Sequence, residues 1–148
     1  MRPIAYSLQF RGQATPFPSD RVRLRLTAPS AVFVTTIDAS GVRGRFEDAS
    51  GDEAVLDGAL SLRPKAGVDF GAIDFGRSNT IGFRSHAARL VRCPDPHLRH
   101  GAVIREVGGG EGQFAGAVGI ITANFFISDT GEVTENQLGL IFVRHEET

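Results

Sequence analysis

The chain has 148 residues, of which 41% are hydrophobic and 22% charged, proportions typical of a single globular domain spanning residues 1–148. Its 16 basic and 17 acidic residues give a formal net charge of -1, which excludes a global electrostatic attraction to nucleic acid or to an anionic membrane. The 18 glycines, the single methionine and the lack of tryptophan favour short strands and turns over helices.

The compartment is predicted from what the sequence lacks. No stretch approaches the ~20 apolar residues of a membrane-spanning helix, and the first residues contain no apolar run typical of a signal peptide. The single cysteine, Cys93, excludes an internal disulfide and fits a reducing compartment. We therefore expect a cytoplasmic protein with no membrane partner.

The first part of the chain predicts a series of strands. Ile4 to Phe10 and Arg21 to Leu26 alternate between apolar and polar residues, so each predicts a strand with one buried face. Ala31 to Ile37 is a continuous β-rich run, which predicts a strand buried on both faces. Val42 to Phe46 predicts a short strand that pairs, across an acidic turn, with the next strand at Ala54 to Leu62.

The second part continues this pattern up to the proline-broken segment after Cys93. Val68 to Gly76 and Ile81 to Ser85 predict strands, whereas His86 to Arg92 fits either a strand or one short helix. Val103 to Val143 then predicts three strands joined by two glycine-rich turns. Nine or ten short strands at intervals of ~8–12 residues indicate a sandwich or a barrel.

Two of the last strands favour the barrel. Neither face of Ala117 to Ile127, nor of Leu138 to Val143, carries a charge, although an antiparallel strand with one solvated face should alternate with polar residues. A closed barrel buries one face in its lumen, and the other face can pack on a partner subunit. We therefore predict an all-β, meander-like, antiparallel closed barrel of about eight strands with little or no helix, assembled as a homo-oligomer, either a dimer or a trimer.

The candidate site lies inside this barrel. An eight-stranded barrel encloses room for its own side chains or for one small ligand. Thr122 and Asn124 on one strand, and Glu135 and Gln137 on the next, are predicted to form a polar patch that orients an apolar small molecule in the lumen. The alternative is that the residues around Glu135 lie at a solvated strand end.

Two further residues complete the candidate set. Tyr6, the only tyrosine, lies on the apolar face of the first strand, so its hydroxyl is either a core group or a weak acid in the lumen. Arg84 is a candidate ligand-binding residue, with pairing to Glu106 on a neighbouring strand as the alternative. Tyr6 and Glu135 are the candidate catalytic residues.

Other chemistries have weaker support. His97 and His100 have a metal-ligand spacing on a helical turn, but the segment is broken by prolines, and no metal is predicted. The sequence contains no phosphate-binding loop, dinucleotide fingerprint or nucleophile elbow, so no cofactor is predicted.

Residues Val107 to Gly119, VGGGEGQFAGAVG, resemble the pattern V-x-G-G-x-G-x-F-x-G-A-x-G of allene oxide cyclases and a similar pattern in plant dirigent proteins. The resemblance is confined to the last third of the chain. It implies an eight-stranded antiparallel barrel, often trimeric, with Phe114 closing one end. It also implies kinship with cyclases that act by holding one substrate conformer. Their catalytic residues lie mostly on earlier strands, and none is assigned here.

Three functions therefore remain open: a cyclase or isomerase acting on an apolar substrate in the lumen, a non-catalytic carrier, and a structural oligomeric barrel. A lumen open at one end would indicate one of the first two. Phenylalanines packed across the barrel axis would indicate the third, and the candidates are Phe75, Phe83, Phe125 and Phe142.

Overall fold

The computed structural model describes residues 1–64 and 67–145. The described strands are β1 (Arg2–Phe17), β2 (Arg21–Ala28), β3 (Ala31–Asp38), β4 (Gly41–Asp48), β5 (Ala54–Ser61), β6 (Asp69–Asp74), β7 (Thr80–Ser85), β8 (Arg89–Val91), β9 (Leu98–Glu111), β10 (Val118–Ser128) and β11 (Glu132–Val143). One 3₁₀ turn, η1 (Gly112–Phe114), precedes β10. No helix in the described residues is long and apolar enough to span a membrane.

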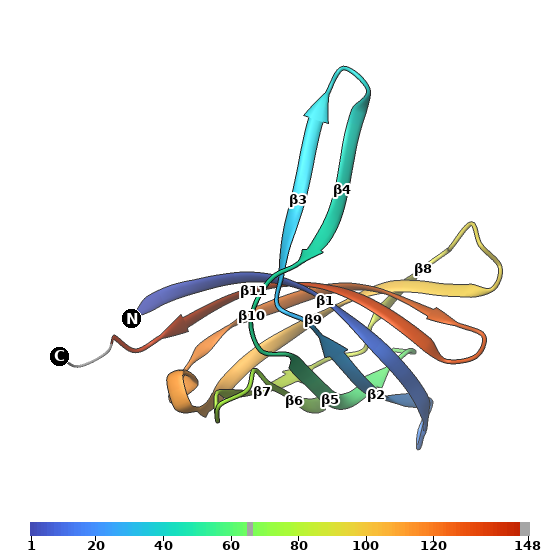
Figure 1. The fold of residues 1–148 in the computed structure, drawn as a ribbon. Helices are drawn as coiled ribbons and strands as arrows, with labels where there is room; N and C mark the ends of the chain where they lie inside the picture. The colour runs from blue at the N-terminus through green and yellow to red at the C-terminus, as the bar shows by residue number, and fades with distance from the viewer. Residues whose placement is uncertain (65–66, 146–148) are drawn as a thin grey trace.

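Eight strands form the barrel, in the order β10-β11-β1-β2-β5-β6-β7-β9 (Figure 1). Each pairs antiparallel with its neighbour, and pairing between β9 and β10 closes the sheet. Strand β8 runs alongside part of β9, and β3 and β4 form a separate hairpin. The prediction of an all-β, antiparallel, meander-like barrel is confirmed.

The barrel interior is filled by side chains. Phe10, Leu56, Ile73 and Ile141 have no accessible surface, so no water-sized space lies beside them. Phe83 and Phe125 are also buried inside, as expected of a filled barrel, whereas Phe142 points outward. Phe114 is buried in η1 and packs against Phe75, with ring centroids 5.3 Å apart, at one end of the interior.

The hairpin of β3 and β4 stands away from the barrel (Figure 1), so the prediction that Ala31 to Ile37 is buried on both faces is wrong. Ile37 is 79% exposed. The predicted pairing of Val42 to Phe46 with the next strand is also wrong, because β4 pairs with β3. The reversal occurs at Asp38 to Gly41, where the side chain of Asp38 accepts hydrogen bonds from the backbone and the hydroxyl of Ser40.

The outer face of β10 and β11 is apolar and exposed in the single chain. Ile120 and Leu138 are 53% and 57% exposed, and their neighbours Leu140 and Phe142 are also exposed. The opposite face of each strand is buried inside the barrel, as predicted. A partner subunit that covers the outer face stays a prediction.

Strand β11 must carry glycine where β1 crosses it. A Cβ atom on Gly139 would overlap the ring of Tyr6, which is the residue paired with it across the ladder. We expect Gly139→Ala to lower the free energy of unfolding by about 1–3 kcal/mol, as overpacking in a well-packed core does. Urea unfolding measures this. Gly108→Ala is the control, because a Cβ there meets nothing within 4 Å. Equal losses in the two variants would contradict the steric explanation.

Candidate functional site

A buried ion pair lies inside the barrel. Arg105 of β9 donates from Nη1 to Oε2 of Glu135 at 2.8 Å and from Nη2 to Oε1 at 2.7 Å. The two side chains are 2% and 0% exposed. The alternation of β9 and β11 explains their position, because each residue lies on the face that carries the buried valines of its strand, Val103 and Val133 among them.

Two more side chains extend this pair into a network. Gln137 donates from Nε2 to Oε2 of Glu135 at 2.7 Å, and the hydroxyl of Tyr6 donates to Oε1 of Gln137 at 2.9 Å. The guanidinium of Arg105 also lies over the ring of Phe83, 5.0 Å from its centroid. The structure therefore brings together Tyr6, Glu135 and Gln137 of the predicted set and adds Arg105.

Burial dominates the electrostatics of Tyr6. Desolvation raises the pKa of its hydroxyl well above the usual range; the charge of Arg105 lowers this pKa, and that of Glu135 raises it by less. Tyr6 therefore remains a neutral hydrogen-bond donor at ordinary pH. Both oxygens of Glu135 are engaged and its side chain has no accessible surface, so the arrangement joins strands together. The catalytic roles of Tyr6 and Glu135 stay predictions.

Three of the predicted residues lie outside the barrel. Thr122 and Asn124 are exposed, because the inward positions of β10 are taken by residues such as Ala123 and Phe125. The register pairs Ala123 with Gln137, which turns Asn124 to the opposite face. The predicted lumen position of Thr122 and Asn124 is therefore wrong.

Arg84 also points outward. Its Nη2 lies 3.0 Å from Oε2 of Glu106, and both side chains are more than half exposed. Its predicted lumen position is wrong, and the alternative, pairing with Glu106 on a neighbouring strand, is confirmed.

A second set of buried polar residues lies on the strands next to Arg105 in the barrel wall: Ser61, Asp69 and Ser85. Ser85 of β7 pairs with Arg105 on one side and with Asp69 of β6 on the other. Oδ2 of Asp69 accepts hydrogen bonds from the backbone nitrogen and the hydroxyl of Ser61, at 2.9 and 2.6 Å. The buried hydroxyl of Ser85 has no hydrogen-bond partner among the described residues. Buried polar groups thus lie in succession on β5, β6, β7 and β9.

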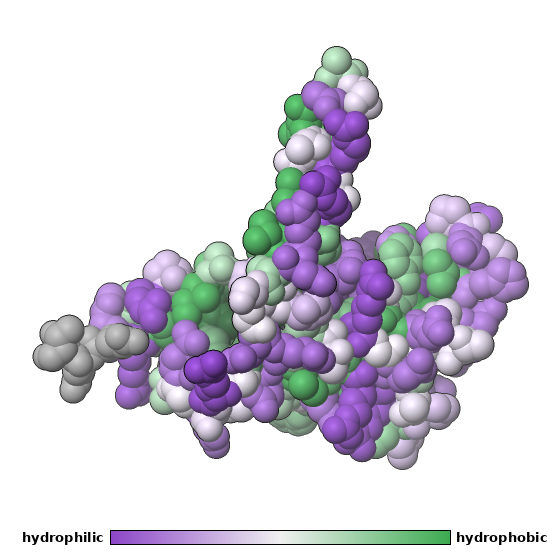
Figure 2. All heavy atoms as spheres, in the orientation of Figure 1, coloured by the Kyte–Doolittle hydropathy of each residue, from purple (hydrophilic) through white to green (hydrophobic). Residues whose placement is uncertain are grey.

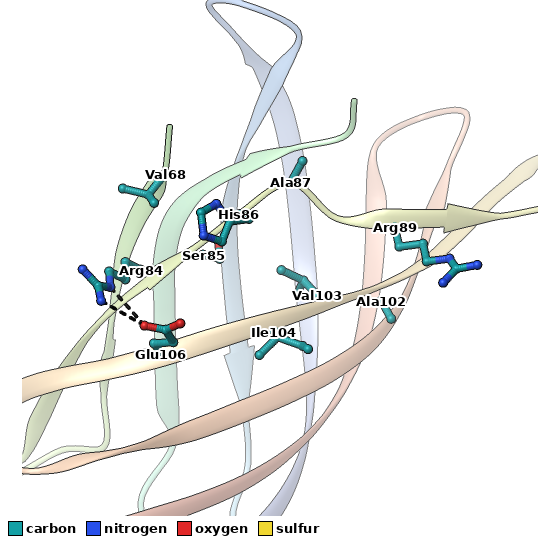
Figure 3. Close-up of a pocket in the computed structure, with 10 residues that line it drawn as sticks. All are labelled: Val68, Arg84, Ser85, His86, Ala87, Arg89, Ala102, Val103, Ile104 and Glu106. Carbon is teal, nitrogen blue, oxygen red and sulfur yellow. Dashed lines mark hydrogen bonds and ion pairs between the residues drawn. The ribbon is translucent and has the colours of Figure 1, made fainter. Parts of the chain in front are cut away.

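The barrel wall is interrupted beside Ser85. Pairing between β7 and β9 ends at Ser85 and Arg105, and pairing between β8 and β9 begins only at Arg89 and Ala102. A pocket of about 600 Å³ lies at this interruption (Figure 3). Its lining residues are Val68, Arg84, Ser85, His86, Ala87, Arg89, Ala102, Val103, Ile104 and Glu106. This site could not be predicted from the sequence, because it arises from a gap in strand pairing.

The pocket combines apolar walls with charged ends. The ion pair of Arg84 and Glu106 lies at one end and Arg89 at the other (Figure 3). Alanine, valine and isoleucine side chains lie between them. The volume is within the ~300–1,000 Å³ that ligand sites occupy, and such sites combine apolar walls with a few polar groups in this way.

The two histidines considered as metal ligands, His97 and His100, contact different partners. Nδ1 of His97 lies 2.9 Å from Oδ2 of Asp129, and this hydrogen bond raises the pKa of the imidazole. His100 stacks on Phe126, with ring centroids 5.2 Å apart. Residues 1–64 and 67–145 contain no group of three or more His, Cys, Asp or Glu side chains placed to hold a metal ion.

No family model, curated protein or solved structure matches the chain. The resemblance to allene oxide cyclases and dirigent proteins is therefore supported only in its architecture, the eight-stranded antiparallel barrel.

The buried ion pair of Arg105 and Glu135 is expected to affect the free energy of unfolding. Arg105→Met leaves the carboxylate of Glu135 buried without its partner, and we expect it to lower the free energy of unfolding by about 3–5 kcal/mol. Adding Glu135→Leu should recover most of this loss, because no unpaired charge remains inside. Urea unfolding checks both variants.

Arg84→Met is the matched control, because it breaks an exposed ion pair and should cost less than about 1 kcal/mol. A double variant that is less stable than Arg105→Met alone would contradict the structural role of the pair.

Proposed function

We propose that this protein is a non-catalytic small-molecule-binding barrel that takes an amphipathic ligand at the interruption of its wall. The observation that carries the proposal is the pocket of about 600 Å³ between β7, β8 and β9, with apolar walls and charges at both ends. Inside the barrel, by contrast, described residues such as Phe10, Leu56 and Ile73 have no accessible surface, because they are packed against one another.

The charges of the pocket favour an anionic ligand. Glu106 neutralises Arg84 at one end, so the net charge of the lining comes from Arg89 at the other. An apolar chain lying along Val103 and Ile104, with its anionic group beside Arg89, would match this distribution. Ser85, whose hydroxyl has no partner among the described residues, lies in the same wall.

A cyclase or isomerase of the allene oxide cyclase-like type is the runner-up. It would require a substrate to reach Glu135 and Tyr6, and both oxygens of Glu135 are occupied by Arg105. Membership of that superfamily and a cytoplasmic location stay predictions. The filled interior also fits a structural barrel, which is the third candidate.

A fluorescent fatty acid with a dansyl group tests the proposal by titration. Ala87→Phe fills the pocket, and we expect it to weaken binding about tenfold or more, which corresponds to ~1.4 kcal/mol. Arg89→Gln should weaken binding of the carboxylate about fivefold, as loss of a partly exposed charge contact does. The methyl ester of the probe should bind equally to Arg89→Gln and to the unchanged chain.

Two controls separate this pocket from other apolar surfaces. Ala115→Phe changes an exposed alanine outside the pocket and should leave binding unchanged. Leu140→Lys places a charge on the apolar outer face of β11 and should also leave it unchanged. If Leu140→Lys abolishes binding and Ala87→Phe does not, the probe binds the outer face and the proposal is wrong.

A further inference from the structure

The hairpin of β3 and β4 (Ala31–Asp48, here called the arm) has one apolar face and one charged face. The register pairs Phe33 with Phe46 and Ile37 with Val42, and alternation places these four residues on the same face. The rings of Phe33 and Phe46 lie 4.6 Å apart. Ile37 and Val42 are 79% and 70% exposed. The apolar face is therefore uncovered toward the tip of the arm.

Four charged residues of the arm lie on the opposite face and pair with one another: Asp38, Arg43, Arg45 and Glu47. Asp48, which is paired with Ala31 at the base of the arm, is the one charged residue on the apolar face. Arg43 pairs with Asp38, and Arg45 donates from Nε to Oε1 of Glu47 at 2.8 Å. A two-stranded hairpin alone is marginally stable in water. The arm has paired charges on one face and exposed phenylalanine, isoleucine and valine side chains on the other. Its apolar face is therefore suited to packing against another apolar surface.

The barrel carries such a surface on the outer face of β1, β10 and β11. We call it the barrel patch, and its residues are Pro3, Ala5, Val118, Ile120, Leu138, Leu140 and Phe142. They lie side by side across the strands, with Leu140 between Ile120 and Ala5, and Phe142 between Val118 and Pro3. None of the seven is charged. Exposed apolar patches of this kind mark interaction sites.

The arm and the barrel patch face the same open corner of the molecule. At the base of the arm, Ala31 and Phe46 line a crevice of about 340 Å³ together with Gln9 and Arg11 of β1. Ala31 and Phe46 belong to the apolar face of the arm, so this face is turned toward the outer side of β1. Figure 2 shows apolar residues along one edge of the arm and on the upper surface of the barrel beside it.

We propose that the partner of both surfaces is a second copy of this chain, with the arm of one copy lying across the barrel patch of the other. A second copy is the occupant that covers both surfaces at once, because each copy supplies an arm and a patch. Eight large apolar side chains of the two surfaces are exposed, at on the order of 100 Å² each, so each copy would bury roughly the 800 Å² of a standard interface.

Variants of the arm test this contact by native mass spectrometry and analytical ultracentrifugation. The unchanged chain should assemble, and Ile37→Lys should weaken assembly at least tenfold. The matched control is Thr36→Lys, which adds the same charge to the opposite face of the arm and should leave assembly intact. Leu140→Lys in the barrel patch should weaken assembly as Ile37→Lys does.

Removal of the arm provides a second test. Ala28 and Ala54 are paired across β2 and β5, so replacing the residues between them by an Asn-Gly turn would close an ordinary hairpin. This variant should keep the far-ultraviolet circular dichroism of a barrel and be monomeric. A folded armless variant that assembles as tightly as the unchanged chain would overturn the proposal.

Cross-linking between two variants identifies the contact itself. With Cys93 replaced by serine, Ile37→Cys and Leu140→Cys chains are mixed and treated with a bifunctional maleimide. A covalent dimer should form in the mixture and not in either chain alone. A chain that stays monomeric at high concentration, or a cross-link that forms equally in the Ile37→Cys chain alone, would overturn the proposal. A dimer in which two copies exchange arms and a closed ring in which each arm lies on the next copy both agree with the proposal. The mass of the assembly distinguishes them.

Discussion

The arrangement of the strands around the barrel interior depends on the bidentate ion pair between Arg105 and Glu135. The two residues come from β9 and β11, which are not adjacent, because β10 pairs with both. Two buried charges cost free energy unless their hydrogen-bonding groups are satisfied, and Gln137, Tyr6 and the ring of Phe83 complete the surroundings. A slip of one residue in the register of β11 would turn Glu135 to solvent and leave Arg105 buried alone, so the pair disfavours slipped registers.

Because side chains fill the barrel interior, the proposed ligand site lies in the barrel wall. Arg105 is paired across the ladder with Ser85, the last residue of β7 paired with β9, and the wall opens immediately beyond this pair. The pocket therefore lies where the buried polar groups meet the end of a strand ladder. This position explains why its lining mixes the inward Ser85 and Val103 with the outward Ile104 and Glu106.

The barrel could be predicted from the sequence because glycine-rich corners and period-two alternation are local signals. The inward face of β10 could not, since Thr122 and Asn124 alternate with Ala123 and Phe125 and neither face is charged. Arg105 was not predicted, because Glu106 follows it directly. The sequence alone does not tell which of these two charged residues points into the barrel. A single basic residue in register with Val103 and Val107 was the available signal. No sequence signal indicates the pocket, because its position depends on the residue at which the pairing of β7 with β9 ends.

The arm shows why composition alone misleads. Ala31 to Ile37 has the composition of a strand buried on both faces, yet it projects from the barrel and is largely exposed. The same excess of apolar residues appears on the outer face of β10 and β11, where Leu138 and Ile120 are also exposed. Burial within one chain accounts for neither surface. The apolar face of a strand must be covered, but the strand sequence does not specify which chain covers it. The proposed contact between copies would cover both segments.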